Sequence, residues 1–384
     1  MKKILIVHNT YKFKGGEDIA VSNEISFLKN HFEVETLMFK NEIKNLFKQI
    51  GYFVRNNDIE STTHLNEKLD SFKPDFVYIH NTWFKASLEI FQILEKRNLP
   101  VLLKLHNFRY KCTRHYFKKN HLDGQHVCNA CGMSDDDSLI FNKYFKESFL
   151  KSLLVINYGI KYFKILRSNN LKILVLTNFH KQILSELGIS NKKVFVYPNY
   201  LNFENTGLSK TKENFIVYAG RISKEKGVEE LINEFLASKI TNTQLRIIGD
   251  GPLLSILKDK YSNYKNLIFM GEMDNQKVLK IIASAKAVVT GTKLLEGQPT
   301  LLCEASMLET PSIFPSNSGI SEFFPVDSNL SYEPNNFYEL RLKIKLILDD
   351  KLLIQEGKKN KEFLKNKLSD NSLITNFEEI LNAK

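Results

Sequence analysis

Long hydrophobic runs are absent from this sequence of 384 residues. No stretch reaches the roughly 18–20 apolar residues that a membrane-spanning helix requires, so the sequence predicts no integral membrane segment. Near the N-terminus, the apolar run ILIV is followed at once by His8 and Asn9. A secretory signal needs about 7–15 apolar residues. We therefore expect a cytoplasmic protein.

Cysteine is also scarce, with 4 residues in the chain, which argues against a disulfide scaffold. Positive charge is in excess, because 54 lysines and arginines against 43 acidic residues give a net charge of +11. This balance favours anionic partners: nucleic acid, an acidic membrane surface or a phosphorylated small molecule. Charge alone does not choose among them.

The apolar residues form short runs that alternate with helical patterns, which indicates parallel, doubly wound α/β sheets. The expected strands are ILIVHN, DFVYIHN, VLLKLHN, ILVLTN and VFVYPN in the first half, and FIVYAG, LRIIGDG, NLIFMGE, AVVTGT and PSIFPS in the second. We predict two Rossmann-like domains that face each other across a cleft. The expected parts are an N-terminal domain, a linker, a C-terminal domain and a helical segment that crosses back to the first domain, at 1–200, 201–214, 215–360 and 361–384.

Two loops that contain glycine follow expected strands, and ligands of open α/β sheets lie beyond the strands' carboxyl ends. Gly15 and Gly16 precede a helical pattern, where free N–H groups can bind an anion, although an ordinary turn is equally consistent. The spacing is not G-x-G-x-x-G, which disfavours a nicotinamide cofactor. Arg221 and Lys226 precede Gly227 and a second helix. They suit a diphosphate, although a solvated basic loop has the same composition.

The stretch EGQPTLLCEAS places two glutamates eight positions apart. Pro299 suits the first turn of a helix, which would leave the N–H groups of Thr300 and Leu301 free for a phosphate. Glu296 in the preceding loop and Glu304 in the helix could contact two parts of one long ligand. They could also be unrelated surface acids.

In their order along the chain, these motifs resemble those of the retaining glycosyltransferases of family 4, which have the GT-B fold. The resemblance covers most of the chain and rests on GGEDIAVSNE, LHNFRYKC with DGQHVCNACG, YPN, GRISKEKG, GDGP and EGQPTLLCEA. Many members have Phe-Gly after the first glutamate of the last motif. This chain has Gly297, Gln298 and Pro299 there, which resembles an E-G-x-P variant and should not abolish donor binding.

The resemblance implies that the C-terminal domain binds a nucleotide sugar. Arg221 and Lys226 would hold the donor diphosphate and stabilise the charge that develops on the leaving group. Glu296 would contact the transferred sugar, and Glu304 would bind the ribose hydroxyls.

The resemblance also implies an acceptor-side role for the N-terminal domain. Gly15 and Gly16 would bring backbone N–H groups near the phosphates, and His106 would lie near the reacting sugar. Without the resemblance, a structural hydrogen bond would be the simpler role for this histidine. The implied mechanism is a front-face, leaving-group-assisted transfer that requires no cofactor.

The expected function is transfer of a sugar from a UDP- or GDP-sugar to a glycan or lipid-linked glycan, in bacterial-type surface polysaccharide biosynthesis. One alternative is a GT-B nucleotide-sugar epimerase, which needs no acceptor. Another is a basic nucleic-acid-binding protein, which would interleave aromatic and basic residues on a surface. The basic residues of the motifs are single and follow strands, which disfavours nucleic acid.

Three cysteines lie in one insert of the first domain, together with several histidines. They are Cys112, Cys128 and Cys131, and the histidines are His115, His121 and His126. One C-x-x-C pair with a further Cys and a His predicts either a structural Cys₃His zinc site or three reduced cysteines packed in a loop. Cys303 is expected in the core.

The stretch 141–172 mixes aromatic residues, leucines and lysines at helical spacing. It predicts either contact with an anionic membrane or an ordinary helix pair packed on the first sheet. Together with the net positive charge, the first interpretation predicts that the protein binds peripherally to the inner face of the cytoplasmic membrane.

Overall fold

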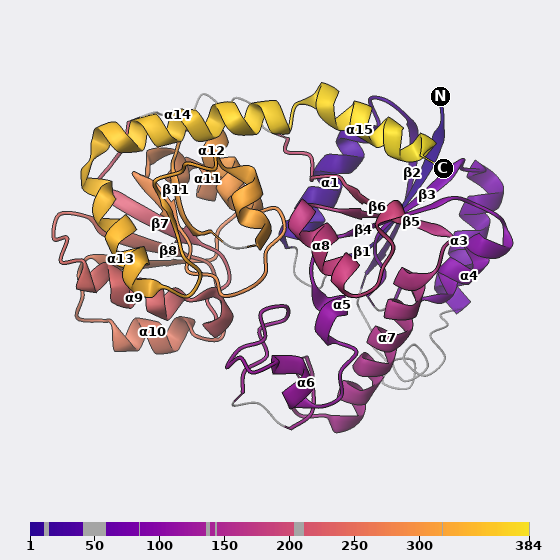
Figure 1. Ribbon diagram of the computed structural model, residues 1–384, viewed down its shortest axis with the longest axis horizontal. Helices are drawn as coiled ribbons and strands as arrows, with labels where there is room; N and C mark the ends of the chain where they lie inside the picture. Colours follow the sequence, from indigo (N-terminus) through magenta and orange to yellow (C-terminus); the bar gives the residue numbers. More distant parts are fainter. Residues whose placement is uncertain are drawn as a thin grey trace. The chain divides into compact units, whose positions relative to one another are not determined.

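The chain forms two compact units in the computed structural model (Figure 1). The described residues are 1–10, 15–40, 59–83, 85–135, 139–142, 144–202, 211–316 and 318–383. Unit 1 combines Met1–Asn202 with Asp370–Lys384, and unit 2 is Phe203–Ser369. The first boundary lies inside the expected linker, of which 203–210 lies outside the described residues. The return to unit 1 begins at Asp370, nine residues later than the expected 361.

Unit 1 contains a six-stranded parallel sheet in the order β2-β1-β3-β4-β5-β6. The strands are β1 (Lys3–Thr10), β2 (Glu33–Lys40), β3 (Phe76–Asn81), β4 (Val101–Leu105), β5 (Leu171–Val175) and β6 (Val194–Val196). Every residue of β4 is buried, as expected for a central strand covered on both faces. The edge strand β2 was not among the expected strands, because EVETLMFK mixes exposed and buried positions and has no continuous apolar run.

Helices lie between these strands along the chain, and most of them cover the sheet of unit 1, whereas α6 lies in an insert away from it (Figure 1). They are α1 (Gly16–Leu28), α3 (Ile59–Phe72), α4 (Glu89–Lys96), α5 (Arg109–Cys112), α6 (Lys118–Leu122), α7 (Phe149–Arg167), α8 (Asn178–Glu186), the 3₁₀ turn η1 (Asn191–Lys193) and α15 (Asp370–Asn382). The described residues of the stretch 141–172 contribute one helix, α7, and not a helix pair. Val155, Ile156 and Leu166 of α7 are fully buried, so one face of the helix packs into unit 1.

The C-terminal helix α15 is part of the core of unit 1. Phe377 is fully buried and packs against three aromatic rings, those of Phe32, Tyr78 and Tyr197. Lys172 on β5 donates hydrogen bonds to three carbonyls near the end of the helix, those of Ile380, Leu381 and Ala383. A lysine at a helix C-terminus satisfies unpaired carbonyls and opposes the helix dipole.

Unit 2 contains a second six-stranded parallel sheet, in the order β12-β11-β10-β7-β8-β9. Its strands are β7 (Phe215–Ala219), β8 (Gln244–Ile248), β9 (Leu267–Gly271), β10 (Ala287–Val289), β11 (Ser312–Pro315) and β12 (Ser331–Tyr332). The helices are α9 (Val228–Ala237), α10 (Leu254–Lys260), α11 (Asn275–Ser284), α12 (Thr300–Met307), α13 (Phe337–Lys345) and α14 (Asp350–Lys367), and the 3₁₀ turns are η2 (Lys224–Lys226), η3 (Ser318–Phe323) and η4 (Leu346–Leu348).

Two parallel, doubly wound sheets confirm the predicted fold class. In each unit the strand order reverses beside the first strand, between β1 and β3 in unit 1 and between β7 and β10 in unit 2. Open α/β sheets bind ligands at the carboxyl ends of the strands beside such a reversal. Among the described residues, none of the helices has the length and apolar character needed to cross a membrane.

Candidate active site

The strand reversal of unit 2 brings together two of the residues that the motifs predict for donor binding. β7 and β10 pair in parallel, with Val217 opposite Val288, so the loops that follow them are neighbours. Lys226 lies after β7 and Glu296 after β10. The Nζ atom of Lys226 lies 2.5 Å from Oε1 of Glu296, and the side chains are 29% and 26% exposed. The pair is therefore accessible to a ligand at this edge of the sheet.

A close backbone contact holds the two loops in this position. Gly227 has a φ of +63°, and a Cβ added to it would lie only 1.9 Å from the carbonyl oxygen of Gly291. The N–H of Lys293 donates to the Glu225 carbonyl at 3.0 Å, and its ammonium pairs with Glu230. Any side chain at position 227 would push the loops apart and separate Lys226 from Glu296.

Arg221 follows β7 in the same loop and is exposed. Tyr218 donates its hydroxyl to the Arg221 carbonyl at 2.8 Å, and the N–H of Ile222 donates to the Asp250 carbonyl at 2.9 Å. Within the described parts of the chain, the Arg221 guanidinium has no ion pair. A fixed backbone with an accessible guanidinium is suited to binding an anion.

Helix α12 lies beyond the Glu296 loop and begins at Thr300, with Pro299 as its N-cap residue. The N–H groups of Thr300 and Leu301 belong to the first turn, whose donors have no partner inside the helix. Glu304 accepts a hydrogen bond from Asn275 Nδ2 at 3.3 Å. Burial raises the pKa of Glu304, and the hydrogen bond from Asn275 acts in the opposite direction. A partly desolvated carboxylate of this kind gains from hydroxyl donors on a ligand.

Gly15 and Gly16 lie at the start of α1 in unit 1, with Gly15 as the N-cap residue. The N–H of Gly15 donates to Asp18 at 2.9 Å, so this donor is already engaged. A Cβ at either glycine would meet no atom within 4 Å, which leaves open space beside the loop. Asp18 also contacts Nε2 of His8 at 2.9 Å. Burial lowers the pKa of His8, and Asp18 opposes that shift.

His106 follows β4 and forms a pair with His80, which lies near the end of β3. Nδ1 of His80 and Nε2 of His106 are 3.0 Å apart. Burial lowers the pKa of both rings well below the usual value, and the nearby ammonium of Lys104 lowers each further. His106 is therefore neutral near pH 7 and can act as a hydrogen-bonding group but not as a cation.

The histidine pair lies beside a charged pair that is wholly buried. Nζ of Lys104 lies 2.7 Å from Oε2 of Glu24, and both side chains are 0% exposed. Tyr78 donates its hydroxyl to the other carboxylate oxygen of Glu24 at 2.6 Å. Burial lowers the pKa of Lys104, and Glu24 opposes that shift. The network fixes β3, which contains His80, and β4, which His106 follows.

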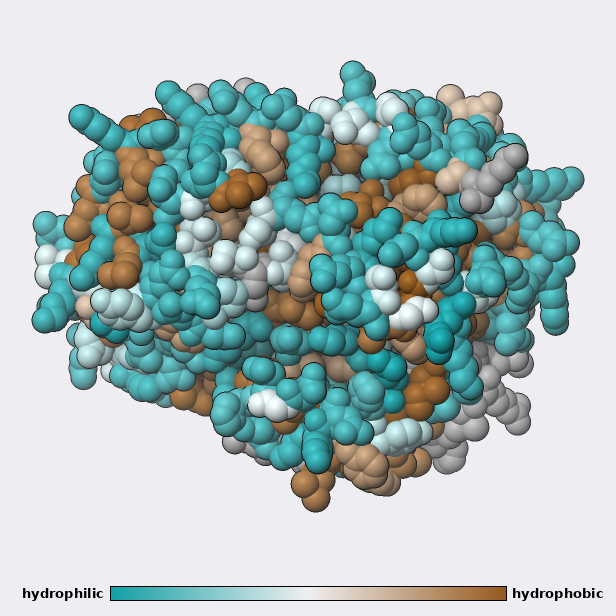
Figure 2. Space-filling view, viewed as in Figure 1, coloured by the Kyte–Doolittle hydropathy of each residue, from teal (hydrophilic) through white to brown (hydrophobic). Residues whose placement is uncertain are grey.

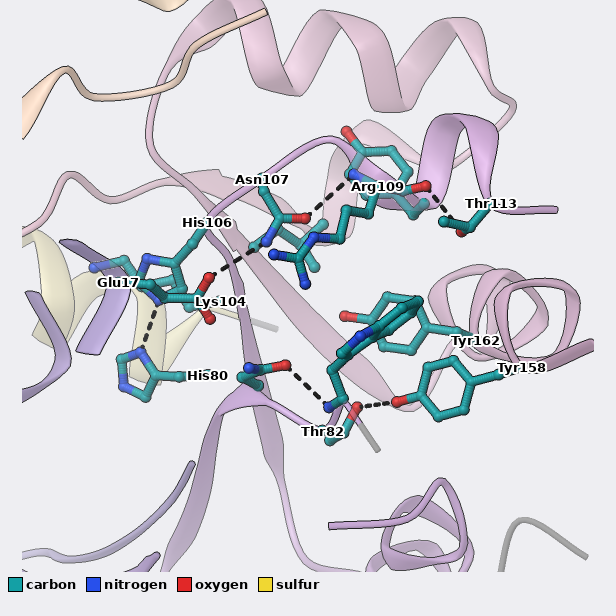
Figure 3. Close-up of a pocket in the computed structure, with 14 residues that line it drawn as sticks. Glu17, His80, Thr82, Lys104, His106, Asn107, Arg109, Thr113, Tyr158 and Tyr162 are labelled. Atoms are coloured by element: carbon teal, nitrogen blue, oxygen red, sulfur yellow. Dashed lines mark hydrogen bonds between the residues drawn. The ribbon is translucent and has the colours of Figure 1, made fainter. Parts of the chain in front are cut away.

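A pocket opens beside His106 at the carboxyl ends of β3 and β4 (Figure 3). Arg109 extends between His106 on one side and Tyr158 and Tyr162 of α7 on the other (Figure 3). The guanidinium carbon of Arg109 lies 5.6 Å from the centre of the Trp83 ring. A cation, aromatic rings and hydroxyl groups in one pocket suit a polar ligand with a ring or an anionic group.

The sequence motifs did not predict most of the residues that line this pocket, although a repeated dipeptide could have indicated them. The strands β1, β3 and β4 are neighbours in the sheet, and the dipeptide His-Asn stands at the end of all three. The three pairs are His8–Asn9, His80–Asn81 and His106–Asn107. The Asn81 side chain donates to the Asn9 carbonyl at 2.9 Å, which ties two of these strand ends together.

The cysteine insert also converges in the structure. The ligand atoms of Cys112, Cys128 and Cys131 lie close to one another and to His121. His126 is instead exposed and contacts Asp135. Cys303 is fully buried in unit 2, which confirms its expected place in the core.

Residues 199–368 match the family model of the glycosyl transferases group 1. The matched segment covers less than half of the chain and lies almost wholly in unit 2. The segment contains the Lys226–Glu296 pair, Arg221 and Glu304, whereas Gly15, Gly16 and His106 lie outside it in unit 1.

Two curated bacterial relatives match part of the chain. TuaC of Bacillus subtilis (strain 168), whose name assigns it to teichuronic acid biosynthesis as a glycosyltransferase, is 31% identical over 124 residues, or 32% of this chain and 30% of that protein. The capsular polysaccharide biosynthesis glycosyltransferase CapM of Staphylococcus aureus is 26% identical over 182 residues, or 44% of this chain and 47% of that protein. The chain thus matches less than half the length of either relative.

Solved structures resemble the whole chain in fold. Sucrose-phosphate synthase from Thermosynechococcus elongatus aligns over 99% of this chain and 98% of its own, with a TM-score of 0.70 and 14% identity. TarM aligns over 100% and 99%, with a TM-score of 0.69 and 14% identity. Anabaena HepE in complex with UDP-glucose aligns over 100% of both chains, with a TM-score of 0.68 and 13% identity. The chain therefore has the GT-B fold that the resemblance implied.

Proposed function

We propose that the protein is a retaining glycosyltransferase that moves a sugar from a nucleotide-sugar donor to a glycan or lipid-linked glycan. The observation that carries the proposal is the Lys226–Glu296 pair, which stands at the strand reversal of unit 2, within the matched segment. The names of TuaC and CapM support a role in the synthesis of bacterial surface polysaccharides.

In this proposal the loops of unit 2 bind the donor. Arg221 and Lys226 bind the diphosphate, together with the N–H groups at the start of α12. Glu296 contacts the transferred sugar, and Glu304 accepts hydrogen bonds from the ribose. The donor is a UDP- or GDP-sugar, and the complexes of HepE with UDP and UDP-glucose favour uridine.

The transfer breaks the bond between the anomeric carbon and the diphosphate oxygen. The electron pair leaves with the diphosphate, and the sugar gains positive charge. An acceptor oxygen forms the new bond on the same face, and its proton passes to the departing phosphate oxygen. The positive charges of Arg221 and Lys226 stabilise the diphosphate as its negative charge develops. Neutral His106 binds a sugar hydroxyl, and the pocket with Arg109 and the aromatic rings receives the acceptor.

A donor screen tests the proposal. We expect the purified chain to bind one nucleoside diphosphate by calorimetry and to release it from the matching nucleotide sugar. The variant Glu304→Gln should bind that nucleotide about 10–150-fold more weakly, since a hydrogen bond to a charged group contributes about 1.5–3 kcal/mol. The control Glu309→Gln changes a glutamate that pairs with Lys361 and should bind the nucleotide as the wild type does.

Three outcomes would contradict the proposal. One is a rise in the melting temperature of the protein with an oligonucleotide but not with UDP or GDP, which would indicate a nucleic-acid-binding protein. Another is release of a rearranged sugar without any acceptor, which would indicate an epimerase. The third concerns retention alone. NMR of the product should show the anomeric configuration of the donor, and an inverted product would exclude a retaining mechanism.

We also propose that unit 1 contacts an anionic membrane surface, where a lipid-linked acceptor would be found. Five exposed apolar side chains form what we call the 116–150 patch: Tyr116, Phe117, Leu139, Phe149 and Leu150. The N–H of Lys118 donates to the Leu139 carbonyl at 2.8 Å, so Phe117 and Leu139 lie on neighbouring backbones. Figure 2 shows hydrophobic side chains at the lower edge of the view, where Figure 1 has α6 and the start of α7.

Vesicle binding tests the 116–150 patch. The chain should sediment with vesicles of anionic phospholipid at low salt and dissociate at high salt, because salt screens the attraction of lysines to the surface. Lys146→Glu and Lys151→Glu should each weaken binding by at least about fivefold, because each basic residue near an anionic surface contributes about 1 kcal/mol of attraction. Lys143, the third lysine of the stretch, lies outside the described residues.

Apolar contact is tested separately with Phe117→Glu and Leu150→Glu, which should also weaken binding. The matched control is Val326→Glu, since Val326 is a fully exposed apolar residue of unit 2. A wild type that ignores anionic vesicles at low salt would exclude the membrane proposal, and so would equal losses in Val326→Glu and Phe117→Glu.

A further inference from the structure

Four side chains of metal-binding type converge in the insert that follows β4. They are Cys112 at the end of α5, His121 in α6, and Cys128 and Cys131 in the segment after α6. Their ligand atoms all lie within 4.8 Å of one another. Three of the residues are buried and Cys131 is partly buried, although the segment that carries them is a surface insert.

The spacing suits one tetrahedral ion. Zinc binds thiolate sulfur at about 2.3 Å and imidazole nitrogen at about 2.0–2.1 Å, which separates tetrahedral ligand atoms by about 3.5–3.8 Å. A set contained within 4.8 Å needs only small side-chain adjustments to reach this geometry. Four protein ligands would fill the coordination sphere, as in structural zinc sites.

The C-x-x-C pair lies at the turn of a short hairpin. Val127 and Ser134 form an antiparallel bridge, and the N–H of Cys128 donates to the Met133 carbonyl at 2.8 Å. Gly132 has a φ of +76°, which lets the chain reverse directly after Cys131. The N–H of Met133 then donates to Sγ of Cys131 at 3.4 Å. The hairpin thus directs both sulfur atoms to one point.

The ring of His121 is oriented as a metal ligand. Its Nδ1 lies 3.2 Å from the Cys112 carbonyl oxygen, and a carbonyl can only accept, so Nδ1 carries the proton. In the neutral ring, Nε2 then has a free lone pair, and it lies 2.9 Å from Sγ of Cys131. Metal-binding histidines commonly donate their other ring N–H to a backbone carbonyl.

We propose that Cys112, His121, Cys128 and Cys131 bind one structural zinc ion. Sulfur and imidazole ligands favour zinc, and a closed set of four leaves no position for substrate. The cysteines bind as thiolates, so loading releases their protons to solvent. The sequence left three histidines as candidates, and the structure selects His121.

The ion would hold one wall of the unit 1 pocket. Cys112 ends α5, the helix that also carries Arg109 and Tyr110 of that pocket. The insert packs on α7 through an apolar cluster that includes Leu122, Met133, Phe141, Val155 and Ile156. A Cβ at Gly159 of α7 would lie 2.7 Å from the Thr113 carbonyl oxygen, so α7 and the end of α5 are in close contact. Loss of the ion should therefore disturb the pocket as well as the insert.

Metal analysis of the full chain tests the site, and it does not depend on the proposed enzymatic function. Protein purified without chelator, through an affinity tag that lacks histidine, should contain one zinc ion per chain. A strong chelator should remove it and lower the melting temperature. His121→Gln and Cys128→Ser should each lose the zinc. The controls His126→Gln and Cys303→Ser change a histidine of the same insert and a buried cysteine of unit 2, and both should keep it.

Several results would overturn the site. The first is wild-type protein that contains no metal and keeps its melting temperature in chelator. A second is a mass lower by two hydrogens under non-reducing conditions, which would show a disulfide within the cluster. Retention of zinc by His121→Gln together with its loss from His126→Gln would disprove the ligand set. If Cys128→Ser does not fold, the metal content of the wild type and of His121→Gln still shows whether the zinc site exists.

Discussion

Lys226→Ala should lower kcat for sugar transfer by about 10²–10³-fold, the usual effect of removing one preorganised group that stabilises developing charge. The negative charge on the diphosphate is larger in the transition state than in the bound donor, so the loss should appear in kcat and in kcat/KM for the donor. The KM for the acceptor should change little. Steady-state kinetics with the donor identified by the screen measures these quantities, and Arg221→Ala should behave in the same way.

The matched control is Lys224→Ala, in the same 3₁₀ turn. Lys224 is exposed, whereas Lys226 contacts Glu296. The control should retain nearly full turnover. Equal turnover in Lys226→Ala and the wild type would remove this lysine from the mechanism. An equal loss in Lys224→Ala would instead indicate a general effect of charge near the loop.

Lys104→Met should lower the free energy of unfolding by about 3–5 kcal/mol, because it leaves the Glu24 carboxylate buried without its cation. Tyr78 would still donate to Glu24, but a hydroxyl does not neutralise the charge. Urea unfolding at neutral pH measures the loss. The double variant Glu24→Gln/Lys104→Met should recover much of the stability, since no unpaired charge then remains in the core.

A surface ion pair supplies the control for this effect. Lys68 and Glu35 are 2.6 Å apart with side chains that are 40% and 41% exposed. Lys68→Met should therefore change the free energy of unfolding by about 0–1 kcal/mol. If Lys104→Met costs no more than Lys68→Met, the buried pair does not stabilise unit 1.

The sheets were predictable because their central strands are buried on both faces and appear as continuous apolar runs. The edge strand β2 has no such run, and β12 has only two residues, so neither produced a signal. The break between α13 and α14 was also hidden. Residues 335–368 show one helical pattern, whereas the structure divides them into α13, η4 and α14 before the chain returns to unit 1.

The motifs predicted individual residues of the site, but they did not predict which of these side chains contact each other. Lys226 and Glu296 contact each other because β10 lies beside β7, and strand order is not visible in the motifs. Lys104 stands inside an apolar strand, and its partner Glu24 is 80 positions away. Likewise, the spacing of the insert does not distinguish His121 from His126. Only the fold buries the first and exposes the second.

The return of α15 to unit 1 has a consequence for synthesis on the ribosome. All residues of unit 2 emerge before Phe377, the side chain that fills the space among Phe32, Tyr78 and Tyr197. The second half of the nascent chain can therefore complete its core first, although domains generally fold in N-terminal order during translation. Until α15 emerges, these aromatic rings remain open to solvent and to chaperones that bind exposed apolar surface.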